Sequence, residues 1–160
     1  MKMLTVCSLL IVFIGCGKSE DELRKIIQDE MSKASRSYVT SAQVIGPYTP
    51  AVKVGNLVFI SGQVGISQET GELVGIDTES QTKQALMNLL SIAKQAGCDS
   101  SDIVQCSVFL RDIKDFSKMN IIYGGFFAEG KYPTRATVEV SNLPRNAKVE
   151  IAAIAVQSKF

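Results

Sequence analysis

Residues 132–140 read YPTRATVEV, and the alternation of residue types in this run indicates how it folds. Aliphatic residues stand at Ala136, Val138 and Val140, with polar residues between them at Arg135, Thr137 and Glu139. Such alternation is typical of a β-strand, whose successive side chains point to opposite faces of a sheet. A strand holds Arg135 in one direction, and its guanidinium can bind a carboxylate through two parallel hydrogen bonds. The run predicts a site for a small organic acid, with a solvated arginine as the alternative.

The size and charge of the chain limit the classes of protein to which it can belong. Its 160 residues suffice for one compact domain, and a hydrophobic content of 46% indicates a folded core. Lys and Arg number 17 against 16 Asp and Glu, so we expect no nucleic-acid partner. The chain has no histidine, which excludes a Ser/His/Asp triad, a Cys/His pair and a histidine-ligated metal centre.

The first residues have the pattern of an export signal. Lys2 is followed by an uncharged run over 3–14, shorter than the roughly 20 residues of a membrane-spanning helix. Gly15 and Cys16 end this run in a way that resembles a bacterial lipobox, in which the cysteine receives the lipid. We predict a signal peptide over 1–15 and export to the bacterial cell envelope, with a lipid on Cys16 as the only membrane anchor. An ordinary signal peptide and a cytosolic protein with an apolar start are the alternatives.

A helical tether is expected after the lipidation site, over residues 16–37. Ser19 and Glu22 have the spacing of a capping box, which marks the start of a helix. One apolar stripe follows, made of Leu23, Ile26, Ile27, Met31 and Ala34. A stripe this narrow usually packs on the domain or on a partner chain.

Residues 38–160 read as one domain. The expected elements are strands over 38–44, 51–54 and 57–62, a helix from a cap at Thr78 and Gln81 to a stop at Gly97, a strand over 103–110, a helix after Asp112, the Arg135 strand, and a strand over 148–157. Gly55 and Asn56 predict the turn of a hairpin, and residues 65–75 predict a loop.

The order β-β-β-α-β-α-β-β predicts an α+β domain, with one mixed sheet and both helices on one of its faces. We expect the other face to carry the polar side chains of Arg135, Thr137 and Glu139. Because a sheet face of this size is usually covered by another subunit, we predict a homo-oligomer with clefts between its subunits.

Two cysteines fall inside this domain, at Cys98 and Cys106. In the strand expected over 103–110, Val104, Cys106 and Val108 share one face, where a buried thiol is common. We predict two free thiols, with a disulfide in an oxidising compartment as the alternative.

Four segments carry side chains suited to chemistry. They present Tyr48 in a tight turn, Ser61 and Gly62 at the end of a buried strand, Arg135 with Thr137, and Glu150 in an apolar strand. Ordinary explanations exist for each, such as a surface turn for Tyr48, a strand-end cap for Ser61 and a lysine partner for Glu150. A carboxyl group in an apolar strand should have its pKa raised toward neutrality, where it can exchange protons.

Several motifs, in order, make the chain similar to the reactive-intermediate deaminase family, also called the RidA or YjgF family. They cover about residues 40–157 and are IGPY at 45–48, VFISGQ at 58–63, GELV at 71–74, Asp115 and Phe116 with Asn120 and Tyr123, PTRATVEV at 133–140, Leu143 with Pro144, and VEI at 149–151. The resemblance implies a chorismate-mutase-like fold and a homotrimer with active sites between neighbouring subunits. It also implies hydrolysis of 2-enamino and 2-imino acids to 2-keto acids and ammonia, without a cofactor.

The resemblance also implies a role for each candidate residue. Arg135 would bind the substrate carboxylate, and Glu150 would assist proton transfer to and from the attacking water. The residues that would orient the substrate are Tyr48, Ser61, Gly62 and Thr137. Thr137 stands at a position where many members of the family that the chain resembles have cysteine or another small residue.

Two other functions remain open. One is a small-acid-binding or envelope-interaction lipoprotein that keeps the fold without catalysis. The other is a nuclease or inhibitor of translation, against which the near-neutral charge and the lack of histidine argue.

Overall fold

The computed structural model describes residues 19–33, 35–40 and 44–158. The chain divides into two compact units, and the boundary between them in the sequence falls after Ser35. Helix α2, Glu20–Lys33, belongs to the first unit. The backbone N–H of Ser19 donates to Glu22 Oε2 at 2.8 Å, and the N–H of Glu22 donates to Ser19 Oγ at 3.3 Å. These two bonds confirm the predicted capping box.

The predicted signal peptide over 1–15 and the lipidation site Cys16 lie outside the described residues, and both stay predictions. In the part of the chain that the structure describes, no helix has the length and apolar character to cross a bilayer.

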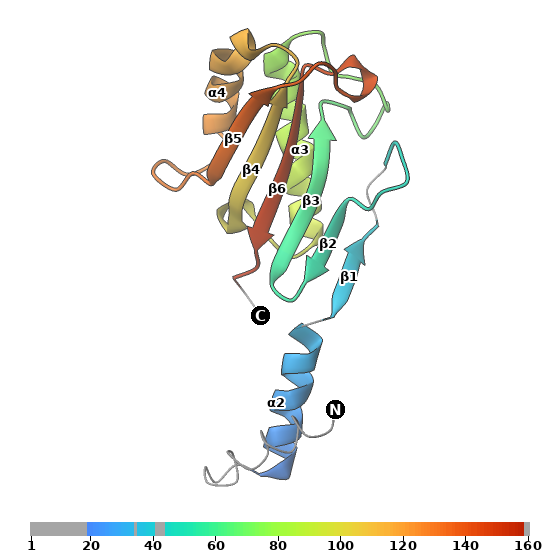
Figure 1. Cartoon of the computed structure of the whole chain (residues 1–160), viewed down its shortest axis with the longest axis vertical. Coiled ribbons are helices and arrows are strands. Elements are labelled where there is room, and N and C mark those ends of the chain that lie inside the picture. The colour runs from blue at the N-terminus through green and yellow to red at the C-terminus, as the bar shows by residue number, and fades with distance from the viewer. Residues whose placement is uncertain (1–18, 34, 41–43, 159–160) are drawn as a thin grey trace. The chain divides into compact units, whose positions relative to one another are not determined.

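The second unit contains one six-stranded sheet with the strand order β1-β2-β3-β6-β4-β5 (Figure 1). The strands are β1 Arg36–Val39, β2 Ala51–Val54, β3 Leu57–Val64, β4 Ile103–Leu110, β5 Thr134–Glu139 and β6 Val149–Val156. Neighbouring strands are antiparallel except β4 and β5, which are parallel. The predicted α+β fold with a mixed sheet is confirmed.

Two helices, α3 Thr78–Gln95 and α4 Phe116–Gly124, pack on the same face of this sheet. Leu86 and Leu89 of α3 and Met119 of α4 are fully buried there, against Val108 of β4 and Ile151 of β6. Short 3-10 helices lie at Ser100–Asp102 (η2), Ile113–Asp115 (η3) and Pro144–Asn146 (η4). The hydrophobic core thus lies between one sheet face and the two helices.

The N-cap of helix α3 lies one residue before the predicted cap at Thr78. Asp77 is the N-cap, and its Oδ1 accepts from the backbone N–H of Ser80 at 2.7 Å. The hydroxyl of Thr78 instead donates to Asp115 Oδ2 at 2.6 Å, which ties α3 to the start of α4. The predicted stop is confirmed, since Gly97 has a φ of 83° after the last turn.

Two strands differ from their predicted form. The first strand spans 36–39 and so begins two residues before its predicted start, while residues 41–43 of the strand predicted over 38–44 lie outside the described residues. In β4, Val104 does not share the buried face of Cys106, because the pairing of β4 with β6 shifts between Ile103 and Gln105. This irregularity adds one residue and leaves Val104 43% exposed. Cys98 and Cys106 are free and buried, as predicted.

The prediction that Arg135, Thr137 and Glu139 lie on the face away from the helices is wrong. Arg135 is paired with Cys106 and Thr137 with Val108, and both of these partners are buried under the helices. Glu139 Oε2 accepts from the N–H of Ile113 in η3 on the same side. The guanidinium is tolerated there because an arginine can pack its stem on apolar groups and keep its charged end at the edge of the sheet.

The face away from the helices instead carries apolar side chains. Leu57 and Phe59 of β3 and Val138 of β5 are 39%, 43% and 46% exposed. Alternation along each strand places them opposite the buried residues.

Truncating the core of this unit should destabilise it strongly. Leu86→Ala should lower the free energy of unfolding by about 2–5 kcal/mol, because Leu86 is fully buried and its removal leaves a cavity. Met87→Ala is the matched control, since Met87 is 49% exposed on the same helix, and it should change stability by less than about 0.5 kcal/mol. Urea unfolding measures both, and equal losses would contradict this packing.

Candidate active site

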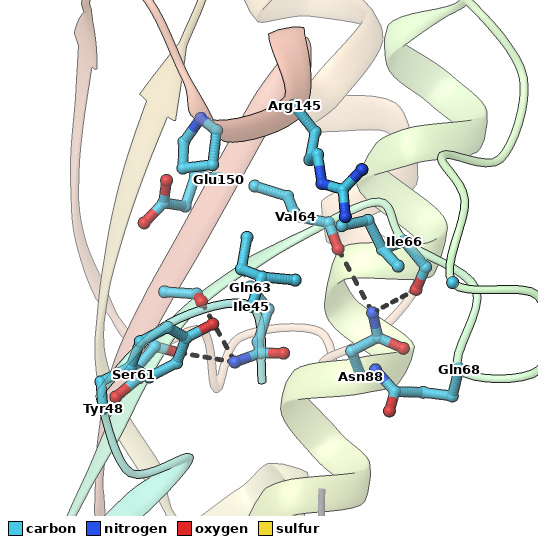
Figure 2. Close-up of a pocket in the computed structure, with 13 residues that line it drawn as sticks. Ile45, Tyr48, Ser61, Gln63, Val64, Ile66, Gln68, Asn88, Arg145 and Glu150 are labelled. Carbon is cyan, nitrogen blue, oxygen red and sulfur yellow. Dashed lines mark hydrogen bonds between the residues drawn. The ribbon is translucent and has the colours of Figure 1, made fainter. Parts of the chain in front are cut away.

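A cleft of about 550 Å³ lies beside β3 and β6 (Figure 2). Four of the six residues predicted to contact substrate line it together, namely Tyr48, Ser61, Gly62 and Glu150. Arg135 and Thr137 are not among its lining residues.

An irregularity in β3 forms one wall of the cleft. The pairing of β3 with β6 shifts between Ile60 and Gln63, which places Ser61 and Gly62 at the bulge. Ser61 Oγ donates to the carbonyl oxygen of Thr49 at 2.7 Å and so joins the strand to the turn that carries Tyr48.

Gly62 is required by the position of Glu150. A Cβ atom at Gly62 would lie 1.9 Å from Glu150 Oε1 and 2.8 Å from the carboxyl carbon. A side chain here would displace the carboxyl group, so the glycine makes room for it.

Glu150 is a half-buried carboxyl group on an otherwise apolar strand. Its neighbours Val149 and Ile151 are fully buried on the helix side, while Glu150 points into the cleft on the other side. Burial raises the pKa of this carboxyl above its ordinary value. No lysine or arginine of the described residues forms an ion pair with Glu150, so the lysine-partner explanation is not supported.

Arg135 lies against helix α4. Its guanidinium carbon is 4.6 Å from the ring centroid of Tyr123 and 5.6 Å from that of Phe116, in cation–π geometry. Its Nη1 is 4.0 Å from the sulfur of Met119. Within the described ranges no carboxylate pairs with this guanidinium, and the hydrogen bond it forms there is the weak one from Nη1 to the sulfur of Met119.

Two polar atoms beside Arg135 also lack partners. The hydroxyl oxygens of Tyr123 and Thr137 are buried, and neither forms a hydrogen bond in the described part of the chain. Burial raises the pKa of Tyr123, which keeps its hydroxyl neutral. Arg135, Tyr123 and Thr137 therefore form a cluster of one cation and two neutral hydroxyl groups.

Arg135 and Glu150 lie on opposite faces of the sheet. Arg135 is paired with Cys106 on the helix side, whereas Glu150 is paired with Phe109 and Val64 on the other side. Within one chain the sheet itself separates them. A site that uses both residues must therefore be built from two chains.

The model of the Endoribonuclease L-PSP family matches residues 39–157. The chain belongs to this family. The resemblance to RidA and YjgF proteins predicted from the motifs is thereby confirmed.

Relatives in the L-PSP family carry two kinds of name. The 2-iminobutanoate/2-iminopropanoate deaminase of Mus musculus is 44% identical over 133 residues, which cover 81% of this chain and 98% of the mouse protein. A RutC family protein of Pyrococcus abyssi is 47% identical over 111 residues, which cover 69% of this chain and 87% of that protein.

Solved structures of L-PSP family members have the same fold. Escherichia coli TdcF with bound serine has a TM-score of 0.70 and 40% identity, covering 76% of this chain and 98% of that chain. The YjgF gene product of E. coli has a TM-score of 0.69 and 40% identity, covering 74% of this chain and 98% of that one.

Asn88 and Arg145 also line the cleft, and neither was predicted from the sequence as a site residue. Asn88 Nδ2 donates to the carbonyl oxygens of Val64 and Ile66 at 3.2 and 2.8 Å and so fixes the wall after β3. A polar residue on the buried stripe of α3 was a signal that could have identified it. Arg145 lies in the short helix η4, and its position after Pro144 gave only a turn signal.

The pKa of Glu150 predicts a pH dependence of stability. The folded protein holds a proton on this carboxyl above the ordinary pKa of 4.5, so the wild type loses stability as pH rises through the higher folded-state pKa. Glu150→Gln stays neutral at every pH. It should be more stable than the wild type near neutral pH and lose this advantage below about pH 4. Urea unfolding near neutral pH and below about pH 4 measures the difference in the free energy of unfolding between Glu150→Gln and the wild type. The same difference at both pH values would contradict the raised pKa.

Proposed function

We propose that this chain is a hydrolytic deaminase that converts 2-imino and 2-enamino acids to 2-keto acids and ammonia. The observation that supports it most is Glu150, a half-buried carboxyl group with a raised pKa that lines a cleft beside Gly62. Such a group can both accept and donate a proton near neutral pH.

The substrate carboxylate would be bound by Arg135 of a neighbouring copy in a homotrimer. A guanidinium matches the planar carboxylate with two parallel hydrogen bonds. The stacking of Arg135 on Tyr123 and Phe116 holds the donor group in one orientation before the substrate arrives. Because Arg135 and Glu150 lie on opposite sheet faces, the neighbouring copy supplies the arginine.

The chemical step is the addition of water to the C2 carbon of the imine. The imine reacts as its iminium ion. As the water oxygen bonds to C2, Glu150 accepts a proton from the water and the π electrons of the C=N bond pass to the nitrogen, which gives a neutral tetrahedral carbinolamine. Glu150 then returns this proton to the nitrogen, and as the C–N bond breaks the C2 hydroxyl gives its proton back to Glu150, so that ammonia leaves and the 2-keto acid remains. No electron is transferred, so the reaction as proposed requires no redox cofactor.

The reaction requires little from the protein beyond positioning of the reacting groups. Imines hydrolyse in water without a catalyst, and holding the acid, the water and a proton carrier together removes much of the entropic barrier. The relatives support this substrate class, since the mouse protein is named an imine deaminase and the TdcF structure contains serine, a small amino acid.

A nuclease is the second candidate, because the family model is described as an endoribonuclease. RNA binding normally requires a basic surface, and this chain carries a net charge of +1. We therefore favour the deaminase. A small-acid-binding protein without catalysis would bind 2-keto acids but release no ammonia.

Replacing Arg135 tests the proposal. Arg135→Ala should lower kcat/KM for 2-iminopropanoate by about a hundredfold, because the substrate carboxylate loses its charged partner. Arg135→Lys should lose about tenfold, since an ammonium group cannot offer the paired donors. Ammonia and pyruvate release from an imine generated in situ measures both.

Arg24→Ala is the control, because Arg24 is an exposed arginine of α2 that pairs with Glu20. It should leave the rate unchanged. An Arg135→Ala protein as fast as the wild type would exclude the proposed role of Arg135. Cleavage of RNA by the same purified wild type, without any imine hydrolysis, would favour the nuclease instead.

A further inference from the structure

Arg145 has an unusual backbone in the wall of the cleft. Its φ and ψ are 58° and 19°, and Asn146 has a φ of 58° as well. The left-handed region is unfavourable for residues other than glycine, and it persists only where the surroundings impose it. Here the N–H groups of Asn146 and Ala147 donate to the carbonyl oxygens of Leu143 and Pro144, both at 3.1 Å.

This turn is anchored at both ends by burial. Leu143 and Ala147 are buried in a small apolar cluster, while Arg145 between them is exposed. A turn fixed in this way presents the Arg145 side chain at a defined place on the cleft. Strained non-glycine backbone of this kind is concentrated at functional sites.

No carboxylate among the described residues forms an ion pair with Arg145. The ion pairs among the described residues join Arg24 to Glu20 and Lys118 to Asp115, and neither includes Arg145. Figure 2 shows Arg145 on the side of the cleft formed by Val64, Ile66 and Gln68. Ser61, Tyr48 and Glu150 lie on the other side.

The groups around Arg145 would not compete with an anion. Glu150 is the only carboxylate among the lining residues that the structure describes, and it forms no ion pair with Arg145. The Asn88 amide at this end already donates to two carbonyl oxygens. Gln68 is exposed and uncharged, so it adds no negative charge at this wall.

We propose that Arg145 forms a second anion subsite, so that the cleft prefers 2-imino acids whose side chain ends in a carboxylate. The proposal rests on the deaminase function, in which Arg135 of a neighbour takes the α-carboxylate and Glu150 serves the reacting carbon. The substrate side chain then extends toward the remaining wall, where Arg145 stands. A volume of about 550 Å³ is in the range of pockets for ligands larger than a three-carbon acid.

Two substrates of equal shape test this subsite. The imines formed in situ by oxidation of glutamate and of glutamine differ only in a terminal carboxylate or amide. The wild-type protein should show a kcat/KM about fivefold to tenfold higher for the glutamate-derived imine. In Arg145→Asn this preference should fall to about one, while Arg145→Lys should keep part of it.

The variants are chosen so that the fold is retained. Asparagine removes the charge and tolerates left-handed backbone, and an unchanged melting temperature verifies folding. Lys83→Gln removes a cation from the exposed side of α3, outside the cleft, and should keep the wild-type preference.

Failure of this proposal can be told apart from failure of the deaminase function. If the wild type hydrolyses 2-iminopropanoate but treats the two larger imines equally, the subsite is excluded and the deaminase stands. A preference that survives in Arg145→Asn also excludes it. If no imine is hydrolysed, the subsite is tested by binding. Titration calorimetry then measures the affinities of the wild type and Arg145→Asn for the corresponding 2-keto acids, which are 2-oxoglutarate and its terminal amide. A wild-type preference for 2-oxoglutarate that Arg145→Asn loses supports the subsite, and equal affinities overturn it.

Discussion

Alternate side chains of a β-strand point to opposite faces of the sheet. This alternation separates Arg135 from Glu150, the two groups on which the proposed chemistry depends. Arg135 stands in a cross-strand row with Cys106 and Ala153, under the helices. Glu150 stands in the row with Phe109 on the other face. No rotamer change can bring the two together, because the sheet lies between them. Assembly of at least two copies is therefore a condition of the mechanism, and the apolar side chains of the sheet face away from the helices give such an assembly a surface to bury.

Each half of the site is prepared by local structure. On one half, the bulge of β3 and the missing side chain of Gly62 leave space for the Glu150 carboxyl, and burial makes this carboxyl a weaker acid. On the other half, aromatic rings of α4 hold the Arg135 guanidinium, which forms no ion pair among the described residues. Each half is held in place by contacts within one chain, which suits a reaction that depends on position.

The sequence was sufficient to predict a helix or strand where its apolar residues followed a single period. The β4 strand and α3 were predicted with nearly correct bounds, because their apolar residues recur with the period of a strand and of a helix. The motifs brought Tyr48, Ser61, Gly62 and Glu150 into one site, and the structure places all four on one cleft. The alternation along β5 indicated the wrong side for the helices, because its polar side chains Arg135 and Thr137 lie under them and its aliphatic Val138 lies on the other face. An irregularity reversed the face of Val104, and the backbone of Arg145 left no sign in the sequence, so neither was predictable from residue types.

The most direct test of a site shared between chains is complementation of two inactive variants. Arg135→Ala and Glu150→Gln proteins would be unfolded together in equal amounts, refolded, and assayed for ammonia release from 2-iminopropanoate. If each cleft takes Arg135 from one chain and Glu150 from another, random assembly leaves about a quarter of the clefts intact and restores about a quarter of the wild-type activity. Activity no greater than that of the two variants refolded separately would contradict the account.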